Sequence, residues 1–217
     1  MMKIVFLVSG SGGNLKFFFQ CIRLGLLKDV ELAVVADRDC PAIDFARTRG
    51  LISEQIAYSR SQPDALRQVL QRMKPDIVVT NWNKIIDKDT VEEYSGKMIN
   101  LHYSLLPAFS GLIGIEPIKQ AYSKGCYYIG PTCHFVDAEV DAGKIIFQSA
   151  FRADMPIEEA IGRMFREGCV SLVFSIWILT RGNLNVQAAL ICRDEPARAE
   201  VAVKNLGGEF WKEIELL

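Results

Sequence analysis

The chain has 217 residues, of which 50% are hydrophobic and 24% are charged. Its 25 Lys and Arg side chains almost balance its 26 Asp and Glu side chains, which gives no electrostatic reason to expect nucleic acid or an anionic membrane as a partner. No run of 18 apolar residues occurs, so no membrane-spanning helix is predicted. The short apolar run after Lys3 is followed at once by glycines, which favours a buried strand over a signal peptide. We therefore expect a cytoplasmic globular protein, either a monomer or a homodimer.

Cysteine and histidine usage points to neither disulfide bonds nor a metal site. The six cysteines lie at irregular spacings with no C-x-x-C pair, so we expect reduced thiols. The two histidines and the scattered acids lack the spacing of metal ligands, and no metal is expected. The cysteines are Cys21, Cys40, Cys126, Cys133, Cys169 and Cys192.

Short β-branched runs alternate with helical patterns in the first half of the chain. This alternation is typical of βαβ units and predicts an α/β fold with a mostly parallel sheet that helices cover on both faces. The predicted strands are 3–9, 30–37, 75–81 and 97–102. The predicted helices are 14–25, 41–49, 62–73 and 87–94.

The second half of the chain has a different pattern. Two strand-like stretches on either side of "AEVDAG" (138–143) predict an antiparallel hairpin whose connection carries Asp141. Residues 183–217 read as short strand-like and polar pieces, and we treat them as a small C-terminal extension of a domain that covers 1–182. The other predictions are helices over 116–125 and 156–182, and strands within 127–137 and 144–151.

A glycine-rich turn follows the first predicted strand in "VSGSGGNLKFFF" (8–19). Its backbone N–H groups and the start of the next helix are suited to binding an anion such as a phosphate. The dinucleotide fingerprint G-x-G-x-x-G needs glycine where this chain has Leu15, although Asp37 ends the second strand as such a fold requires. The alternative is that the glycines only permit a tight turn.

Asn100 and His102, in "INLHYS", would lie on the same side of an extended strand, at its carboxyl end. Ligands of open α/β sheets bind at that end, and an amide beside an imidazole could stabilise an oxyanion. If Asp141 reached His102, its carboxylate would raise the pKa of the imidazole. The alternatives are that His102 only satisfies a loop carbonyl and that Asp141 only caps a turn. His134 alternates with apolar neighbours, so we expect it to be structural or to support a residue of the site.

Three motifs taken together resemble the folate-dependent formyltransferases, namely "VSGSGGNL", "INLHYSLLP" and "CHFVDAEVDAGKIIFQ". The likeness extends over nearly the whole chain to about residue 180 and is greatest to the phosphoribosylglycinamide formyltransferases. The chain is also similar to the catalytic domain of formyltetrahydrofolate deformylase, through "PAF.G", "QAY..G" and "IG.TCH". The resemblance implies a Rossmann-like sheet and an enzyme that uses 10-formyltetrahydrofolate as its formyl donor.

The resemblance also implies roles for particular residues. Asn100, His102 and Asp141 match the family's catalytic Asn, His and Asp. The implied binding site for the acceptor and its phosphate consists of Ser11, Gly12, Gly13, Asn14 and Glu167. The implied folate-binding residues are Asn83, Lys84, Ile85, Ile86, Asp137 and Val140.

Two departures from the family pattern bear on the substrates. "TNWNKII" (80–86) is shorter and more polar than the family's usual segment, and Ile113 and Ile115 stand where members with nucleotide substrates carry histidine. We expect formyl transfer to a phosphorylated primary amine, with glycinamide ribonucleotide of purine biosynthesis as the leading acceptor. The alternatives are N-formylation of an amino sugar, hydrolysis of 10-formyltetrahydrofolate by a deformylase and, outside the family, a dinucleotide-binding oxidoreductase.

Overall fold

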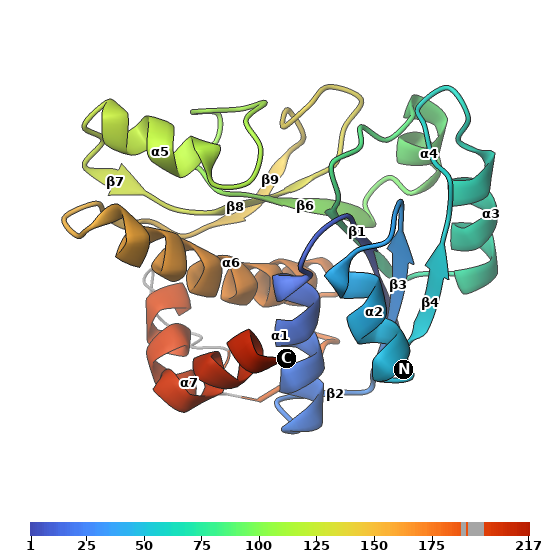
Figure 1. Ribbon diagram of the computed structural model, residues 1–217, viewed down its shortest axis with the longest axis horizontal. Coiled ribbons are helices and arrows are strands. Elements are labelled where there is room, and N and C mark those ends of the chain that lie inside the picture. The colour runs from blue at the N-terminus through green and yellow to red at the C-terminus, as the bar shows by residue number, and fades with distance from the viewer. Residues whose placement is uncertain (188–189, 191–197) are drawn as a thin grey trace. The chain divides into compact units, whose positions relative to one another are not determined.

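The computed structural model describes residues 1–187, 190 and 198–217 (Figure 1). The chain divides into two compact units. The first comprises Met1–Asn100, Phe135–Ala138 and Ile214–Leu217, and the second comprises Leu101–His134 and Glu139–Glu213. The predicted boundary at residue 182, between a domain and its extension, stays a prediction.

Five parallel strands follow one another in the order β4-β3-β1-β5-β6, and all belong to the first unit except the last two residues of β6. Counted along the chain without the two-residue strand β2 (Leu27–Lys28), this is the order third, second, first, fourth, fifth of a Rossmann-like sheet. The order reverses between β1 and β5, and ligands of such sheets bind beyond the carboxyl ends of these strands. The five strands are β1 (Met2–Val8), β3 (Val30–Ala36), β4 (Ile52–Gln55), β5 (Ile77–Asn81) and β6 (Met98–His102).

Helices cover both faces of this sheet, which confirms the predicted α/β fold. Phe6 of β1 contacts Phe18 of α1 edge to face, with ring centroids 5.3 Å apart. The adjacent residues Val5 and Leu7 point to the opposite face, where they belong to a core cluster with residues of α3 and α4 (Figure 1). The helices are α1 (Gly13–Arg23), α2 (Pro41–Thr48), α3 (Asp64–Met73) and α4 (Lys88–Glu93). β4 was not predicted, because "ISEQ" is a short edge strand without an apolar alternation.

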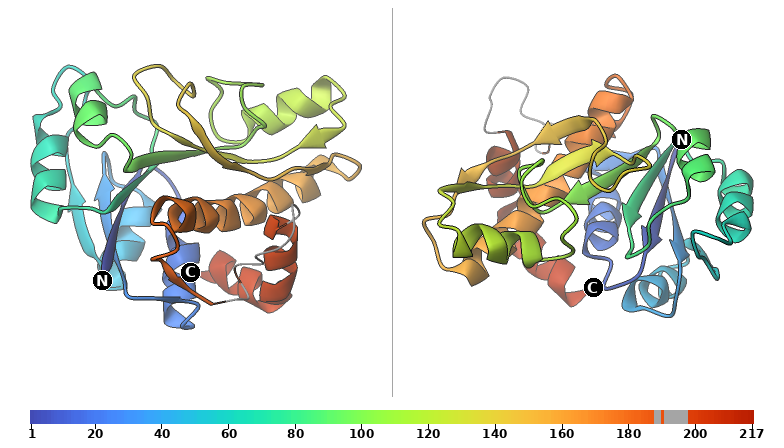
Figure 2. Two further views of the ribbon diagram at one scale, coloured as in Figure 1. Left: turned by 180° about the vertical axis from the view of Figure 1, so that it is seen from behind. Right: turned by 90° about the horizontal axis from the view of Figure 1, so that it is seen from above.

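The second unit contains two antiparallel strand pairs, two helices and most of a third, C-terminal helix (Figure 2). The predicted hairpin is present, since β8 pairs with β9 and Asp141 lies in their connection. Each predicted strand is interrupted, the first at residues 130–131 and the second at residues 149–150. Gly130 lies so close to the carbonyl of Ser149 that no side chain fits there. Ile118 of α5 and Met164 of α6 share a core cluster with Phe151. The elements are α5 (Glu116–Ser123), β7 (Tyr128–Ile129), β8 (Thr132–Phe135), β9 (Ile145–Gln148), β10 (Phe151–Arg152) and α6 (Ile157–Leu179).

The C-terminal region differs from the prediction. It contains a two-residue strand, β11 (Asn185–Val186), and a helix, α7 (Arg198–Leu216), so the prediction of strand-like pieces is wrong for most of the described part. Gly207 adopts a φ of 72° inside α7 and kinks it, which explains why the sequence shows no continuous helical pattern. Cys192 lies outside the described residues, as do 188–189 and the rest of 191–197.

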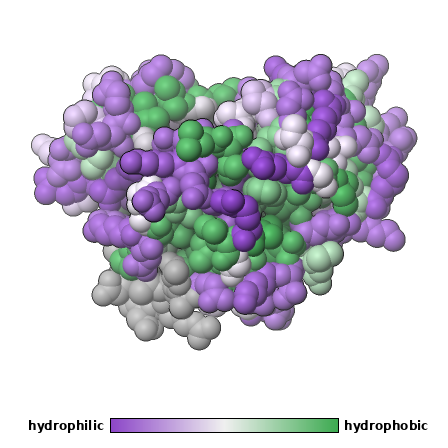
Figure 3. Space-filling model, turned by 60° about the horizontal axis from the view of Figure 1, so that its bottom comes forward, coloured by the Kyte–Doolittle hydropathy of each residue, from purple (hydrophilic) through white to green (hydrophobic). Residues whose placement is uncertain are grey.

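The described part of the chain shows the state of five cysteines and the lengths of the apolar helices. Among the described residues, Cys21, Cys40, Cys126, Cys133 and Cys169 form no disulfide bond. Burial raises the pKa of Cys133 to about 12. Among the helices that the structure describes, none is both long enough and apolar enough to cross a membrane. Hydrophilic side chains alternate with apolar surface on the face drawn in Figure 3, as the composition leads one to expect.

Candidate active site

His102 ends β6 and is buried in the second unit. Its Nδ1 atom lies 3.3 Å from Oδ2 of Asp141, and its Nε2 atom lies 3.1 Å from the carbonyl oxygen of Phe109. Only 6% of its surface is exposed. The structure therefore brings together the His and Asp side chains that the sequence analysis paired. The contact with Phe109 also corresponds to the simpler alternative, in which His102 satisfies a loop carbonyl, so the catalytic role stays a prediction.

Asp141 is the centre of the polar contacts around His102. Its Oδ2 atom accepts a hydrogen bond of 2.8 Å from the backbone N–H of Gly111, and its Oδ1 atom lies 3.6 Å from Nε2 of His134. The backbone of Asp141 is left-handed, with a φ of 56°, a conformation that aspartate tolerates better than most residues. Its contacts to His102, His134 and Gly111 hold the carboxylate in place. The contact with His134 agrees with the expectation that His134 is structural or supports a residue of the site. The contact with Gly111 could not be predicted, because it is made by a backbone N–H.

Burial and polar contacts have opposite effects on the pKa values of His102 and Asp141. Burial lowers the pKa of His102 below its usual range, although the charge of Asp141 and the contact with the carbonyl of Phe109 oppose this. The predicted effect of Asp141 on His102 is present, since its charge raises the pKa of the imidazole, but the effect of burial is larger and the net shift is downward. Burial also works against the ionisation of Asp141, but hydrogen bonds from His134 and Gly111 outweigh it and lower the pKa of this carboxyl. Both shifts favour a neutral His102 beside an ionised Asp141.

Asn100 precedes His102 by two residues in β6, so the two side chains leave the strand on the same side. Its Oδ1 atom accepts a hydrogen bond of 3.1 Å from the hydroxyl of Thr80, a buried residue of β5. The same hydroxyl lies 3.2 Å from the carbonyl oxygen of Ile99, so Thr80 bonds both to the backbone of β6 and to the side chain of Asn100. Thr80 was not predicted to have a role, although it lies beside Asn100 in the register of β5 and β6.

The glycine turn leads from β1 into α1 in the first unit. Gly12 has a φ of 73°, and a Cβ atom at this position would lie 2.6 Å from the Cβ of Ala42 in α2. Both facts require glycine here. Gly13 begins α1, whose first turn contains no acidic residue and whose N-cap, Gly12, forms no side-chain cap. Ser11 is exposed and Asn14 is buried. The turn therefore has a packing role in addition to the predicted role in anion binding.

The predicted folate-binding residues do not all present their side chains to solvent. Asn83, Lys84 and Ile85 are exposed, whereas Ile86 is 4% exposed and belongs to the core of the first unit. The backbone N–H of Asn83 donates to the hydroxyl of Ser9, which itself donates to Asp37. These bonds join the ends of β1, β3 and β5. Of the remaining two residues, Asp137 accepts a hydrogen bond from the N–H of Ala138, and Val140 is 47% exposed.

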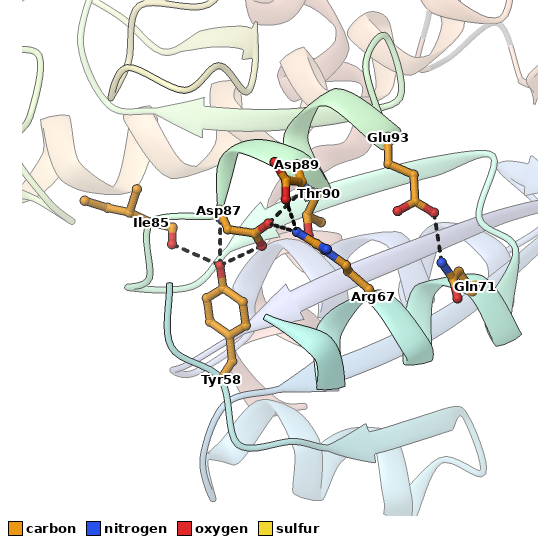
Figure 4. A network of polar contacts seen from close by, with 8 residues as sticks. All are labelled: Tyr58, Arg67, Gln71, Ile85, Asp87, Asp89, Thr90 and Glu93. Atoms are coloured by element: carbon orange, nitrogen blue, oxygen red, sulfur yellow. Dashed lines mark hydrogen bonds and ion pairs between the residues drawn. The ribbon is translucent and has the colours of Figure 1, made fainter. Parts of the chain in front are cut away.

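A network of polar contacts centres on Asp87, the residue that follows the predicted folate-binding residues 83–86 (Figure 4). Asp87 caps α4 by accepting the N–H of Thr90, and it pairs with Arg67 of α3 at 2.7 Å. The hydroxyl of Tyr58 accepts the N–H of Asp87 at 2.8 Å and lies 3.2 Å from the carbonyl oxygen of Ile85. None of these roles was predicted. An acid at the start of a helix is a recognisable cap signal, but its partners from other elements are not visible in the sequence.

Glu167 of α6 is engaged by residues of its own unit. Its Oε1 atom lies 2.7 Å from Nε of Arg163, and its Oε2 atom accepts a hydrogen bond of 2.8 Å from the hydroxyl of Ser149. The residue is 1% exposed. The structure therefore shows Glu167 in a buried ion pair, although the resemblance implies that it receives the acceptor.

The sheet order and the buried His and Asp pair define a Rossmann-like α/β protein with a candidate acid–base site in its second unit. A family model described as "Formyl transferase" matches residues 2–166. The chain belongs to the formyl transferase family.

Individual relatives agree with this assignment. The chain is 33% identical over 178 residues to the chloroplastic phosphoribosylglycinamide formyltransferase of Arabidopsis thaliana, and the match covers 76% of this chain and 61% of the relative. It is 38% identical over 105 residues to the formyltetrahydrofolate deformylase of Haemophilus influenzae, which covers 48% of this chain and 37% of that protein. The chain thus spans about three fifths of the first relative and little more than a third of the second. Glycinamide ribonucleotide transformylase 1 from Symbiobacterium toebii is similar in structure, with a TM-score of 0.74, 31% identity, and coverage of 86% of this chain and 91% of that one.

Proposed function

We propose that this protein transfers a formyl group from 10-formyltetrahydrofolate to the primary amine of a phosphorylated small molecule, with glycinamide ribonucleotide as the leading acceptor. The observation that carries the proposal is the contact of His102 with Asp141, with Asn100 two residues earlier on the same strand. Membership of the formyl transferase family supports it. So do the names of the relatives from Arabidopsis thaliana and Symbiobacterium toebii.

The proposed reaction consists of one addition and one elimination. The amine nitrogen attacks the formyl carbon, a carbon–nitrogen bond forms, and the carbonyl oxygen becomes an oxyanion. The amide N–H of Asn100 and an N–H of His102 stabilise this charge. The bond from carbon to N10 of the folate then breaks, N10 gains a proton, and the attacking nitrogen loses one.

The electrostatics of His102 suit a transient proton carrier. The neutral ring has one N–H but faces two acceptors, the carbonyl of Phe109 and the carboxylate of Asp141. A second proton on the ring would therefore find a partner, and Asp141 would stabilise the imidazolium. To reach the substrate, Nε2 of His102 has to exchange its contact with Phe109 for one with the substrate.

We assign the acceptor's phosphate to the glycine turn. The first turn of α1 presents backbone N–H groups with no acidic side chain among them, and the partial positive charge of a helix start favours an anion.

The oxidoreductase alternative gains no support from Asp37. The carboxylate that would bind a nucleotide ribose is 1% exposed and is bound by Arg38 and Ser9.

A deformylase remains the second candidate, because the identity to the Haemophilus influenzae deformylase is 38% over the matched 105 residues. One experiment separates the two functions. The purified protein is incubated with 10-formyltetrahydrofolate, with and without glycinamide ribonucleotide or an amino sugar nucleotide, and the release of tetrahydrofolate is followed. Release that requires an amine supports transfer, equal release without amine supports hydrolysis, and no release in any mixture contradicts both.

A further inference from the structure

The side-chain amide of Asn100 has two ends of nearly the same shape and opposite polarity. Its Oδ1 atom accepts hydrogen bonds, whereas its Nδ2 group donates them. The proposed reaction needs a donor at the developing oxyanion, so the amide has to present its nitrogen to the substrate. Asn100 is only partly buried, and rotation of its amide exchanges the two ends. A neighbouring group that binds the oxygen would fix the orientation that the reaction requires.

Thr80 is such a neighbour of Asn100. The two residues lie side by side in the register of the parallel strands β5 and β6, so their side chains leave the sheet on the same face. The hydroxyl of Thr80 lies 3.1 Å from Oδ1 of Asn100. Thr80 is 7% exposed, and its branched side chain adopts few rotamers. The hydroxyl is therefore held in place beside the amide.

The single hydrogen of this hydroxyl has two oxygen atoms within reach, because the carbonyl oxygen of Ile99 lies 3.2 Å away. The backbone ladder supplies that carbonyl with another donor. The N–H of Val78 donates to the carbonyl of Lys97, and a parallel ladder repeats every second residue, which places the backbone N–H of Thr80 on the carbonyl of Ile99. The carbonyl of Ile99 thus does not depend on the hydroxyl, whose hydrogen is available to Oδ1 of Asn100.

We propose that Thr80 is a positioning residue, which donates to the amide oxygen of Asn100 and so turns the amide nitrogen toward the formyl oxygen. The inference rests on the proposed function, because it concerns the orientation of a side chain in that reaction. In the reverse orientation the amide would present its oxygen to the oxyanion, and the two negative partial charges would repel each other. Thr80 acts only through Asn100, so its removal should slow the transfer without weakening the binding of either substrate.

The kinetic test measures the release of tetrahydrofolate in a single turnover of the full chain, with 10-formyltetrahydrofolate and glycinamide ribonucleotide. Thr80→Val preserves the shape of the side chain and removes its hydroxyl. It should slow release about five- to tenfold, the effect of one hydrogen bond, and leave both KM values unchanged. Thr80→Ser retains the hydroxyl and should restore a rate close to that of the wild type. Thr90→Val is the matched control, since it removes another buried hydroxyl of the first unit, one that binds Arg67, and should not change the rate.

A double-mutant cycle separates positioning from a general effect on the sheet. In an Asn100→Ala background, Thr80→Val should cause no further loss, because the side chain that Thr80 positions is absent. NMR tests the orientation itself without any turnover. In the wild type, the side-chain NH2 protons of Asn100, whose signals Asn100→Ala assigns, should show no nuclear Overhauser effect to the methyl group of Thr80.

A wild-type rate in Thr80→Val would overturn the proposal, and so would equal losses in the two backgrounds of the cycle. Strong Overhauser effects between the Asn100 amide protons and the Thr80 methyl group would overturn it even if Thr80→Val does not fold. In each of these cases formyl transfer by the wild type would stand. If the wild type releases no tetrahydrofolate with any acceptor, the proposed function fails and the catalytic part of this inference fails with it, whereas the NMR result still decides the orientation of the amide.

Discussion

Oδ2 of Asp141 lies 3.3 Å from Nδ1 of His102, and the same oxygen accepts the N–H of Gly111 at 2.8 Å. The backbone bond positions the carboxylate independently of the charge on the imidazole. Burial lowers the pKa of His102, and the charge of Asp141 limits that fall. The two effects can be separated by a substitution at residue 141, because the effect of Asp141 depends on its charge and the effect of burial does not.

Asp141→Asn should lower the pKa of His102 further, since the neutral amide no longer favours the imidazolium. NMR titration of the ring signals measures this directly. The chain has two histidines, and His134→Gln assigns the signals. The alkaline loss of any activity that needs protonated His102 should move to lower pH in the variant. An unchanged His102 titration would mean that Asp141 only caps its turn.

His102→Ala and Asn100→Ala should each reduce turnover at least about a hundredfold, because each removes a donor to the developing oxyanion. Thermal unfolding and circular dichroism should show that both variants are folded. Asn183→Ala, at an exposed asparagine after α6, is the matched control and should retain full turnover. Near-normal rates in either site variant would contradict the assignment of the catalytic residues.

Gly12→Ala should be destabilised by about 1 to 3 kcal/mol, because alanine has to adopt a left-handed conformation and its Cβ meets Ala42. Gly10→Ala is the control, since a Cβ there has no neighbour within 4 Å. If the turn also holds the acceptor's phosphate, Gly12→Val should raise the KM of the acceptor more than that of 10-formyltetrahydrofolate. Equal effects on both would leave the turn with its packing role alone.

The main features of the sheet could be predicted because local sequence determines them. The apolar run of β1 and the period-two placing of Asn100 and His102 follow from strand geometry. The contact between His102 and Asp141 was predicted only as a possibility, because it joins residues 39 positions apart. The family motifs, rather than the spacing, favoured that pairing.

Other features depend on packing that a sequence does not reveal. The net fall in the pKa of His102 follows from its burial, which was not known beforehand. Glu167 was assigned to the acceptor although Arg163 stands four residues before it, a spacing that regularly gives helical ion pairs. That pair could have been anticipated. A contact of His102 with a loop carbonyl was among the alternatives, but Phe109 could not be named as its source, since a backbone carbonyl carries no side-chain signal.

Asp87 stabilises the first unit through its contacts with Arg67, Thr90 and Tyr58 (Figure 4). Burial works against the ionisation of Asp87, but hydrogen bonds from Arg67 and Thr90 outweigh it and lower the pKa of this carboxyl. Asp87→Ala removes the cap of α4 and leaves the hydroxyl of Tyr58 with one partner fewer. We expect a loss of about 2 to 4 kcal/mol at pH 7, from the cap and the buried hydrogen bonds together.

The pH dependence of this loss follows from the direction of the pKa shift. Because the carboxyl ionises more easily in the folded protein, its contribution is present above the unfolded pKa of about 3.9 and is lost as the pH falls through the folded value. The difference in stability between the wild type and Asp87→Ala should therefore shrink below about pH 4, as urea unfolding at several pH values would show. Asp89→Ala is the control, because Asp89 binds the same arginine with a side chain that is 76% exposed, so its loss should change stability little. Equal losses in the two variants, or a difference that stays constant down to pH 3, would show that the Asp87 carboxylate does not stabilise this unit through its charge.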